Sequence, residues 1–417
     1  MLRKKDTFAL TPPMGWNSWD CYGASVNEAQ LLANAEVMRD VLKPCGWEYV
    51  VCDIQWSGPT ADSVHYHPFA KLCMDEYGRL LPAPNRFPSG FRAIAERIHE
   101  MGLKFGIHIM RGIPRQAVYA DCPILGADCT ARNVAMGHKE CIWNTDMYGV
   151  RPDHPGSQAY YDSIFALYAE WGVDFVKVDD ICRTDYSADS YASRADVEMI
   201  RRAIDRCGRP IVLSLSPGPA RVDCAWHLCE NANMWRLVDD LWDNWPSVKA
   251  VFERFEAWQA FVQPGCWPDA DMLPVGMLRM WSGGDLCRLT QDEQITLLSM
   301  WCIFRAPLMV GGELTRLDGF TRKLLTRIDV LDLLKTPHAA RQLRRNENEA
   351  VWTTLDKENR PVFGLFNLSD APRTVTAEGA ENAAAWRNLW TDETVPGNGT
   401  LISATLDAHA CALLRRA

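Results

Sequence analysis

The sequence predicts an α/β protein in which a (β/α)8 TIM barrel, residues 1–335, precedes an antiparallel β-sandwich, residues 336–417. From about residue 14 to residue 310, short apolar runs alternate with amphipathic stretches, which is typical of parallel strands joined by helices. After Thr336 the apolar runs are short, alternating and separated by turns, as in an antiparallel sandwich. No glycine-rich loop follows the first expected strand, which counts against a dinucleotide-binding sheet.

The barrel part contains six apolar runs that predict buried strands and six amphipathic stretches that predict helices. The expected strands are 15–19, 49–53, 104–109, 175–179, 211–215 and 233–237. The expected helices are 27–41, 90–101, 157–170, 195–207, 247–261 and 290–304. In the sandwich the expected strands are 351–355, 362–367, 373–377, 385–389, 401–404 and 410–414. About eight strand–helix units in ~300 residues fit a closed barrel better than an open sheet.

The composition and charge of the chain exclude several classes of protein. The chain has 417 residues and a net charge of −9, so it lacks the basic excess with which proteins neutralise nucleic-acid phosphates. No window approaches the ~18 apolar residues of a membrane span, so we expect no membrane partner. Tryptophan is abundant, with 17 residues, and this abundance favours aromatic surfaces that stack on sugar rings.

The cysteines predict a reducing compartment rather than a metal site. The basic N-terminal residues are not followed by a long apolar run, so we expect no secretory signal there. The 15 cysteines then predict reduced thiols in the cytoplasm. One group could offer zinc a His-x-x-Cys spacing, but its first two cysteines lack a tight C-x-x-C spacing; the group is Cys122, Cys129, His138 and Cys141. We therefore expect no metal and no cofactor.

Charged and aromatic side chains gather at the ends of the expected strands, where barrel enzymes carry their chemistry. These side chains are Trp16, Trp19, Asp53, His108, Lys177, Asp179, Arg236, Asp239 and Asp240. Carboxylates and cations suit sugar hydroxyls, an indole covers the apolar face of a ring, and glycoside hydrolysis needs two carboxyl groups. Trp16 is expected to pack in the core. The segment between Asp53 and Gly90 is expected to form an active-site loop.

Five motifs follow one another along the chain: PPMGWNSW (12–19), VVCDIQW (50–56), WGVDFVKVDD (171–180), NMWRLVDDLWDNW (233–245) and WPDADMLPVG (267–276). Together they resemble glycoside hydrolase family 27, which contains α-galactosidases and α-N-acetylgalactosaminidases. The resemblance covers essentially the whole chain. It implies a retaining exo-glycosidase of the α-galactosidase type, which removes a terminal α-linked galactose-like sugar from an oligosaccharide or glycoside. It leaves a homo-oligomer open.

The resemblance also implies a role for each matching residue. Asp179 matches the nucleophile, and Asp240, four residues after the arginine of its motif, matches the general acid/base. The residues implied to bind the sugar are Trp19, Asp53, His108, Lys177, Ser216, Arg236, Asp271 and Met272. In the implied double displacement a covalent glycosyl–Asp179 forms and is then hydrolysed. Lys177 is expected to keep Asp179 ionised, and Asp239 to disfavour charge on Asp240.

The chain departs from the family pattern at two places that would contact the sugar. The usual second-strand motif has two consecutive acids, whereas Ile54 follows Asp53 here. α-Galactosidases have a glutamate where Ser216 stands; N-acetylgalactosaminidases have a serine there and a small residue three positions on, where this chain has Pro219. Galactose, N-acetylgalactosamine, β-L-arabinopyranose and the glucose of isomaltose-type glucans therefore stay open. A catalytically silent sugar-binding module is the alternative outside the enzymes.

Overall fold

In the computed structural model the largest sheet is a ring of eight short parallel strands. The structure describes residues 3–379 and 383–417. Along the sheet the order is β10-β9-β8-β7-β3-β2-β1-β13. The strands are β1 (Met14–Asn17), β2 (Tyr49–Cys52), β3 (Lys104–Met110), β7 (Phe175–Asp179), β8 (Val212–Leu215), β9 (Met234–Arg236), β10 (Trp267–Asp269) and β13 (Leu308–Val310). A parallel bridge between Leu273 and Val310 joins the segment after β10 to β13 and closes the barrel.

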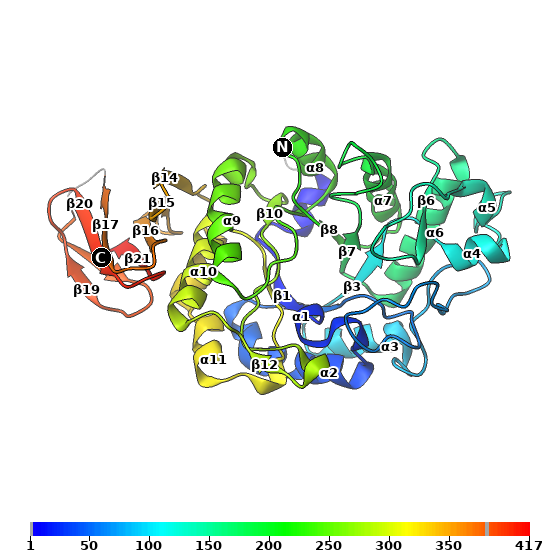
Figure 1. Cartoon of the computed structure of the whole chain (residues 1–417), viewed down its shortest axis with the longest axis horizontal. Helices are drawn as coiled ribbons and strands as arrows, with labels where there is room; N and C mark the ends of the chain where they lie inside the picture. The colour runs from blue at the N-terminus through cyan, green and yellow to red at the C-terminus, as the bar shows by residue number, and fades with distance from the viewer. Residues whose placement is uncertain (1–2, 380–382) are drawn as a thin grey trace.

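Helices cover the outside of this barrel (Figure 1). They are α1 (Trp19–Tyr22), α2 (Glu28–Val37), α3 (Gly90–Glu100), α6 (Pro155–Trp171), α7 (Arg194–Arg206), α8 (Ala225–Asn231), α9 (Trp245–Trp258), α10 (Gln291–Phe304), α11 (Gly319–Leu325) and α12 (Ile328–Leu331). Asn27 caps α2 by accepting a hydrogen bond from the N–H of Gln30, and Thr290 caps α10 from the N–H of Glu293. These caps fix where the two helices begin.

The parallel register gathers polar side chains at the carboxyl edge of the barrel. His108 of β3 lies opposite Lys177 of β7, and Met110 lies opposite Asp179. On the other side of β7, Lys177 lies opposite Ser214 of β8. Because parallel strands end at the same edge of a sheet, the loops that follow these strands meet above one site.

An insertion after β3 extends the barrel at the end remote from the sandwich (Figure 1). It holds a small antiparallel sheet in the order β4-β6-β5 and two short helices. The elements are β4 (Ile113–Pro114), α4 (Arg115–Ala120), α5 (Ala131–Val134), β5 (Ala135–Met136) and β6 (Met147–Val150). A separate two-stranded ribbon, β11 (Met277–Leu278) with β12 (Asp285–Leu286), precedes α10.

The C-terminal region is built from antiparallel strands. A six-stranded sheet runs β14-β15-β16-β21-β18-β19, and β17 pairs with β20 across it. The strands are β14 (Arg341–Arg345), β15 (Glu349–Leu355), β16 (Pro361–Asn367), β17 (Arg373–Glu378), β18 (Ala385–Asn388), β19 (Thr394–Pro396), β20 (Leu401–Leu406) and β21 (Cys411–Arg416). Its outer core includes Phe363, Val375 and Ile402. Its inner face packs on the barrel, where Trp352 meets Phe304 of α10.

The predicted fold class, a TIM barrel followed by an antiparallel sandwich, is confirmed. All the expected strands and helices are present, with ends that differ by at most four residues. The sequence did not single out four short strands, β10, β13, β14 and β19. The boundary predicted at 335/336 falls between α12 and β14.

The interpretation of tryptophan as mainly a stacking surface is wrong. Ten of the 17 tryptophans are buried. Several of these satisfy the indole N–H inside the core: Trp16 donates to the carbonyl of Gly312, Trp47 to that of Leu325 and Trp267 to that of Ala9. These indoles therefore supply apolar bulk between the barrel and its helices.

Candidate active site

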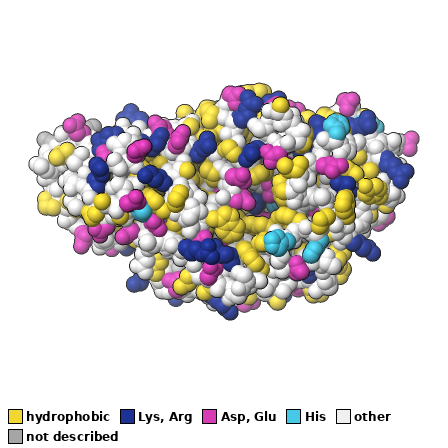
Figure 2. Space-filling model, viewed as in Figure 1, with side chains coloured by type: hydrophobic (Ala, Val, Ile, Leu, Met, Phe, Trp, Pro, Cys, Tyr) yellow, Lys and Arg dark blue, Asp and Glu magenta, His cyan; other side chains and the backbone are white. Residues whose placement is uncertain are grey.

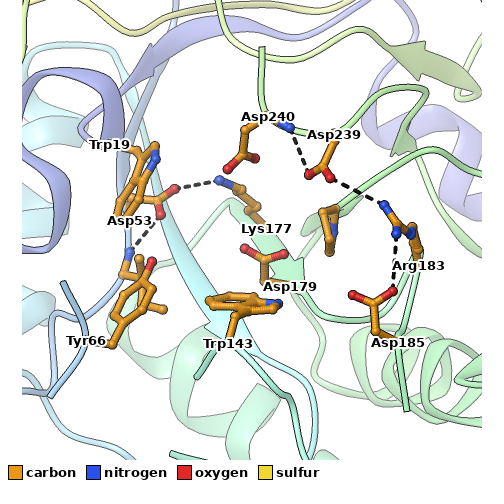
Figure 3. Close-up of a pocket in the computed structure, with 12 residues that line it drawn as sticks. Trp19, Asp53, Tyr66, Trp143, Lys177, Asp179, Arg183, Asp185, Asp239 and Asp240 are labelled. Carbon is orange, nitrogen blue, oxygen red and sulfur yellow. Dashed lines mark hydrogen bonds and ion pairs between the residues drawn. The ribbon is translucent and has the colours of Figure 1, made fainter. Parts of the chain in front are cut away.

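A pocket of about 300 Å³ opens at the carboxyl edge of the barrel. Figure 2 shows hydrophobic side chains in the hollow at the middle of this face, with acidic side chains at its edge. The pocket is lined by Trp19, Asp53, Ile54, Tyr66, Trp143, Lys177, Asp179, Arg183, Asp185, Pro217, Asp239 and Asp240 (Figure 3). Five of the predicted site residues are therefore together in one pocket: Trp19, Asp53, Lys177, Asp179 and Asp240.

Asp179, at the end of β7, is held by hydrogen bonds on both carboxylate oxygens. Oδ1 accepts from the N–H of Asp180 at 3.0 Å, and Oδ2 lies 3.1 Å from Nε2 of His108. Because an ionised carboxylate only accepts, Nε2 of His108 carries the hydrogen. Burial raises the pKa of Asp179, but the hydrogen bond and charge of His108, then Lys177, outweigh it and hold the pKa well below its usual range. Asp179 is therefore ionised and oriented, as a nucleophile must be.

Asp53 and Lys177 form a buried ion pair beside the nucleophile. Nζ of Lys177 donates to Oδ2 of Asp53 at 3.0 Å, and the side chain of Asn17 donates to the same oxygen at 2.7 Å. Burial raises the pKa of Asp53, whereas Lys177 and His108 lower it further, so Asp53 is ionised. Lys177 carries its charge between the two acids, where it can also donate to a sugar hydroxyl.

Asp240 stands at the mouth of the pocket with its side chain 57% exposed. Its Oδ1 lies 3.2 Å from Nη2 of Arg236, which is buried and also pairs with Asp271 at 2.7 Å. Asp271 in turn accepts from the N–H of Leu241, the residue after Asp240. Asp271 thus fixes both Arg236 and the loop that carries Asp240, and its side chain does not line the main pocket.

Four other predicted sugar-binding residues lie beneath the main pocket. Ser216, Arg236, Asp271 and Met272 surround a second cavity of about 20 Å³. The hydroxyl of Ser216 donates to the carbonyl of Val178 at 3.4 Å. A cavity of this size holds about one water molecule. His108 lines neither cavity and acts on the site through Asp179.

Asp239 does not take the role that the sequence suggested. Its carboxylate turns away from Asp240: Oδ2 pairs with Nη1 of Arg183 at 3.3 Å, and Oδ1 accepts from the N–H of Asp240. Arg183 therefore balances the charge of Asp239, and the cation nearest Asp240 is Arg236.

Several pocket residues were missed by the sequence analysis because loops bring them in from afar. Tyr66 comes from the expected active-site loop; its ring stacks on Trp19 with centroids 6.0 Å apart. Trp143 comes from the β5–β6 loop of the insertion, and its ring lies 5.6 Å from Tyr66. No strand precedes these residues directly, so no strand-end signal marks them. The doublet after Val178 does carry a signal, since the second acid, Asp180, follows the predicted nucleophile.

Asp180 and Arg111 form a buried support behind the nucleophile. Asp180 has φ +53°, a left-handed conformation that points its N–H at Asp179. Nε of Arg111 donates to the carbonyl of Asp180 at 2.7 Å, and Nη2 lies 2.6 Å from its carboxylate. Burial raises the pKa of Asp180 to about 7, although Arg111 opposes this. Arg111 is thus a positioning residue, because it holds the turn that orients Asp179.

Other features of the sequence analysis have a plain structural counterpart. All 15 cysteines are free. Within residues 3–379 and 383–417, no three His, Cys, Asp or Glu side chains are grouped so as to hold a metal ion. In the same ranges no helix has the length and apolar character needed to cross a bilayer.

The barrel, with its pocket of paired carboxylates, cations and aromatic rings, defines the chain as a glycoside hydrolase. The sequence profile of the family described as alpha galactosidase A matches residues 11–131 and 135–335. The profile of the alpha galactosidase C-terminal beta sandwich domain matches residues 346–416. The chain therefore belongs to the α-galactosidase family, glycoside hydrolase family 27.

Similar proteins of several kinds are known. Alpha-galactosidase 2 of Arabidopsis thaliana is 27% identical over 97% of this chain and 88% of its own length. A crystal structure of a β-L-arabinopyranosidase from Geobacillus stearothermophilus is 49% identical, with a TM-score of 0.96, and covers 100% of this chain and 98% of its own. A putative α-N-acetylgalactosaminidase from Bacillus halodurans is 45% identical, with a TM-score of 0.87, and covers 97% of both chains.

Proposed function

We propose that this chain is an exo-acting, retaining β-L-arabinopyranosidase. The observation that carries the proposal is Ile54, a buried apolar side chain that lines the pocket directly after Asp53. β-L-Arabinopyranose has the ring configuration of α-D-galactopyranose but lacks the C6 hydroxymethyl group. Ile54 offers no hydrogen bond where the family pattern has a second acid for the 4/6 region of the sugar. Burying a hydroxyl without a partner costs about 1–3 kcal/mol, so the pentose is favoured.

Two further observations support a sugar with hydroxyls at C2 and without a C6 group. The Geobacillus stearothermophilus protein, which shares 49% identity over the whole chain, is a β-L-arabinopyranosidase. The cavity beside Ser216 measures about 20 Å³, which suits one water molecule but is too small for an acetamido group. The second point argues against N-acetylgalactosamine.

The proposed mechanism is a double displacement with retention. A carboxylate oxygen of Asp179 attacks C1 and forms a glycosyl ester, while Asp240 gives its proton to the glycosidic oxygen and the alcohol departs. Asp240 then takes a proton from a water molecule, whose oxygen attacks C1 and displaces Asp179. Lys177 and Asp53 bind ring hydroxyls, and Trp19 covers the apolar face of the ring.

α-D-Galactosidase activity is the second candidate. The sequence motifs favoured it, and curated relatives such as that of Arabidopsis thaliana are α-galactosidases. Asp53, Lys177 and Trp19 would hold galactose and arabinopyranose in the same orientation, because the two rings differ only at C5. The choice between them therefore depends on the space and the polarity around Ile54.

A set of nitrophenyl glycosides tests the proposal. We expect kcat/KM for the β-L-arabinopyranoside to exceed that for the α-D-galactopyranoside by about tenfold or more, and the α-N-acetylgalactosaminide not to react. Ile54→Ala, which only adds space, should raise galactoside turnover slightly. Ile54→Asp, which adds space and an acceptor, should raise it further. A wild-type enzyme that prefers the galactoside would replace the proposal with the second candidate; no turnover of any member would refute both.

A further inference from the structure

The pocket has a second half that no predicted sugar-binding residue occupies. In Figure 3, Trp19, Asp53 and Tyr66 lie on one side, Arg183 and Asp185 on the other, and Asp179 and Asp240 between them. The sugar that is cleaved is held by Asp53 and Lys177 on the buried side. Because Asp240 protonates the glycosidic oxygen, the departing alcohol has to extend into the open half.

Arg183 is the hydrogen-bond donor of this open half. Nη1 lies 3.3 Å from Oδ2 of Asp239, and Nη2 lies 3.3 Å from Oδ1 of Asp185. The side chain of Arg183 is 36% exposed, and both aspartates are more exposed still. Exposed ion pairs of this kind are weak, and a guanidinium group carries five N–H donors, of which these contacts use two. Arg183 is therefore held at the pocket and can still donate to hydroxyl groups of a ligand.

Trp143 supplies an aromatic face to the same mouth. It is partly exposed, and its ring extends the row of Trp19 and Tyr66 toward Asp179. An indole face near a donor that can reach hydroxyls is a pairing that suits a sugar ring. The charge around the open half restricts the ligand further. Four carboxylates, Asp179, Asp185, Asp239 and Asp240, face one guanidinium there, so an anionic group would be repelled.

We propose that Arg183 and Trp143 form a leaving-group subsite for a neutral sugar ring that bears hydroxyls. Arg183 donates to the ring hydroxyls, and Trp143 covers an apolar face of the ring. The natural substrate is then an oligosaccharide rather than the glycoside of a simple alcohol. This inference rests on the proposed function, because the assignment of Asp179 and Asp240 decides which half of the pocket receives the leaving group.

Three substrates with the same β-L-arabinopyranosyl group separate the two contacts. The leaving alcohols are methanol, cyclohexylmethanol and the 6-hydroxyl of glucose, which add first a ring and then the ring hydroxyls. For Arg183→Met we expect the ratio of kcat/KM for the glucose disaccharide to that for the cyclohexylmethyl glycoside to fall roughly tenfold. For Trp143→Ala we expect both ring-bearing substrates to lose roughly tenfold relative to the methyl glycoside.

Arg221→Met is the matched control for the arginine. Arg221 is also an exposed arginine between two aspartates, Asp189 and Asp223, but it does not line the pocket. This variant should leave all three ratios at the wild-type values. Ratios that Arg183→Met leaves unchanged, or that Arg221→Met changes equally, would overturn the subsite. Failure of the wild type to cleave even the methyl and nitrophenyl arabinosides would instead refute the proposed function.

Discussion

The two halves of the pocket use the same type of residue in opposite settings. In the buried half, Asp53 and Asp179 are shielded from solvent and every carboxylate oxygen has a partner in the protein. In the open half, Asp239 and Asp240 are more than half exposed and have long ion pairs with Arg183 and Arg236. The sequence presents these aspartates as equivalent strand-end acids; the structure separates them by burial.

This difference separates the two tasks of a retaining glycosidase. A nucleophile has to stay ionised and oriented, which His108, Lys177 and the N–H of Asp180 accomplish for Asp179 in a setting of low polarisability. A general acid/base has to exchange protons with water between the two steps, which an exposed position permits for Asp240. Burial thus suits the first role and exposure the second.

The largest expected effect comes from exchanging the carboxylates for amides. Asp179→Asn should lower kcat/KM by at least about 10⁴-fold for every substrate, because no covalent intermediate can form. Asp240→Asn should lower it by about 10²–10⁴-fold for a disaccharide and far less for a nitrophenyl glycoside, whose leaving group needs little protonation. Circular dichroism spectra that match the wild type serve as the control for folding. The comparison fails if Asp240→Asn affects both substrates equally.

A smaller effect is expected from the hydrogen bond to the nucleophile. His108→Phe removes a donor to a charged oxygen, which should lower kcat by about 10- to 100-fold. The pKa of Asp179 should rise, because the hydrogen bond of His108 is the strongest influence that lowers it. Activity requires the ionised form and is lost as the pH falls through this pKa. The acidic limb of the kcat/KM profile should therefore move to higher pH in the variant.

His108→Tyr is the matched control for this change, since a tyrosine at this position keeps a donor of similar reach. It should recover most of the rate and return the acidic limb toward its wild-type place. If His108→Phe leaves the limb unmoved while the rate falls, the histidine only fills space beside β7 and does not tune Asp179.

The smallest effect on activity is expected at the support behind the nucleophile. Asp180→Asn keeps an acceptor for Arg111 and the backbone N–H for Asp179, so kcat should change by less than about threefold. Stability should respond more. The pKa of Asp180 in the folded chain, about 7, lies above the ordinary value near 4, so the folded chain binds this proton more tightly than the unfolded chain does.

The free energy of unfolding of the wild type should therefore fall, relative to Asp180→Asn, as the pH rises from about 4 to about 7. Thermal unfolding at several pH values measures this. At pH 4 both side chains are neutral, and the two proteins provide their own baseline there. Parallel curves over the whole range would show that Arg111 keeps Asp180 ionised throughout.

Periodicity allowed most of the fold to be predicted, because buried strands and amphipathic helices leave regular apolar patterns. β10 and β13 were not singled out, since three residues with one proline in the first give no period to detect. β14, with the sequence RQLRR, is mostly exposed and charged, so it forms by pairing with β15 and not from an apolar pattern of its own.

The site was predictable where its residues follow strands and not where loops supply them. Asp53, Lys177 and Asp179 were found in this way. Tyr66 and Trp143 were not, because their place depends on how long loops fold over the barrel. The sequence also could not show that Asp239 turns to Arg183, since neighbours along a loop give no side-chain direction.

The most direct test of this division of roles is to trap the covalent intermediate. A difluorinated β-L-arabinopyranosyl donor slows the second step, so the sugar should remain attached to the enzyme. Peptide mapping by mass spectrometry of the inactivated wild type should find one sugar on the carboxylate of Asp179. A label on Asp240 or Asp53, or release of the sugar with inverted configuration and no labelled peptide, would contradict the assignment of the buried carboxylate as nucleophile.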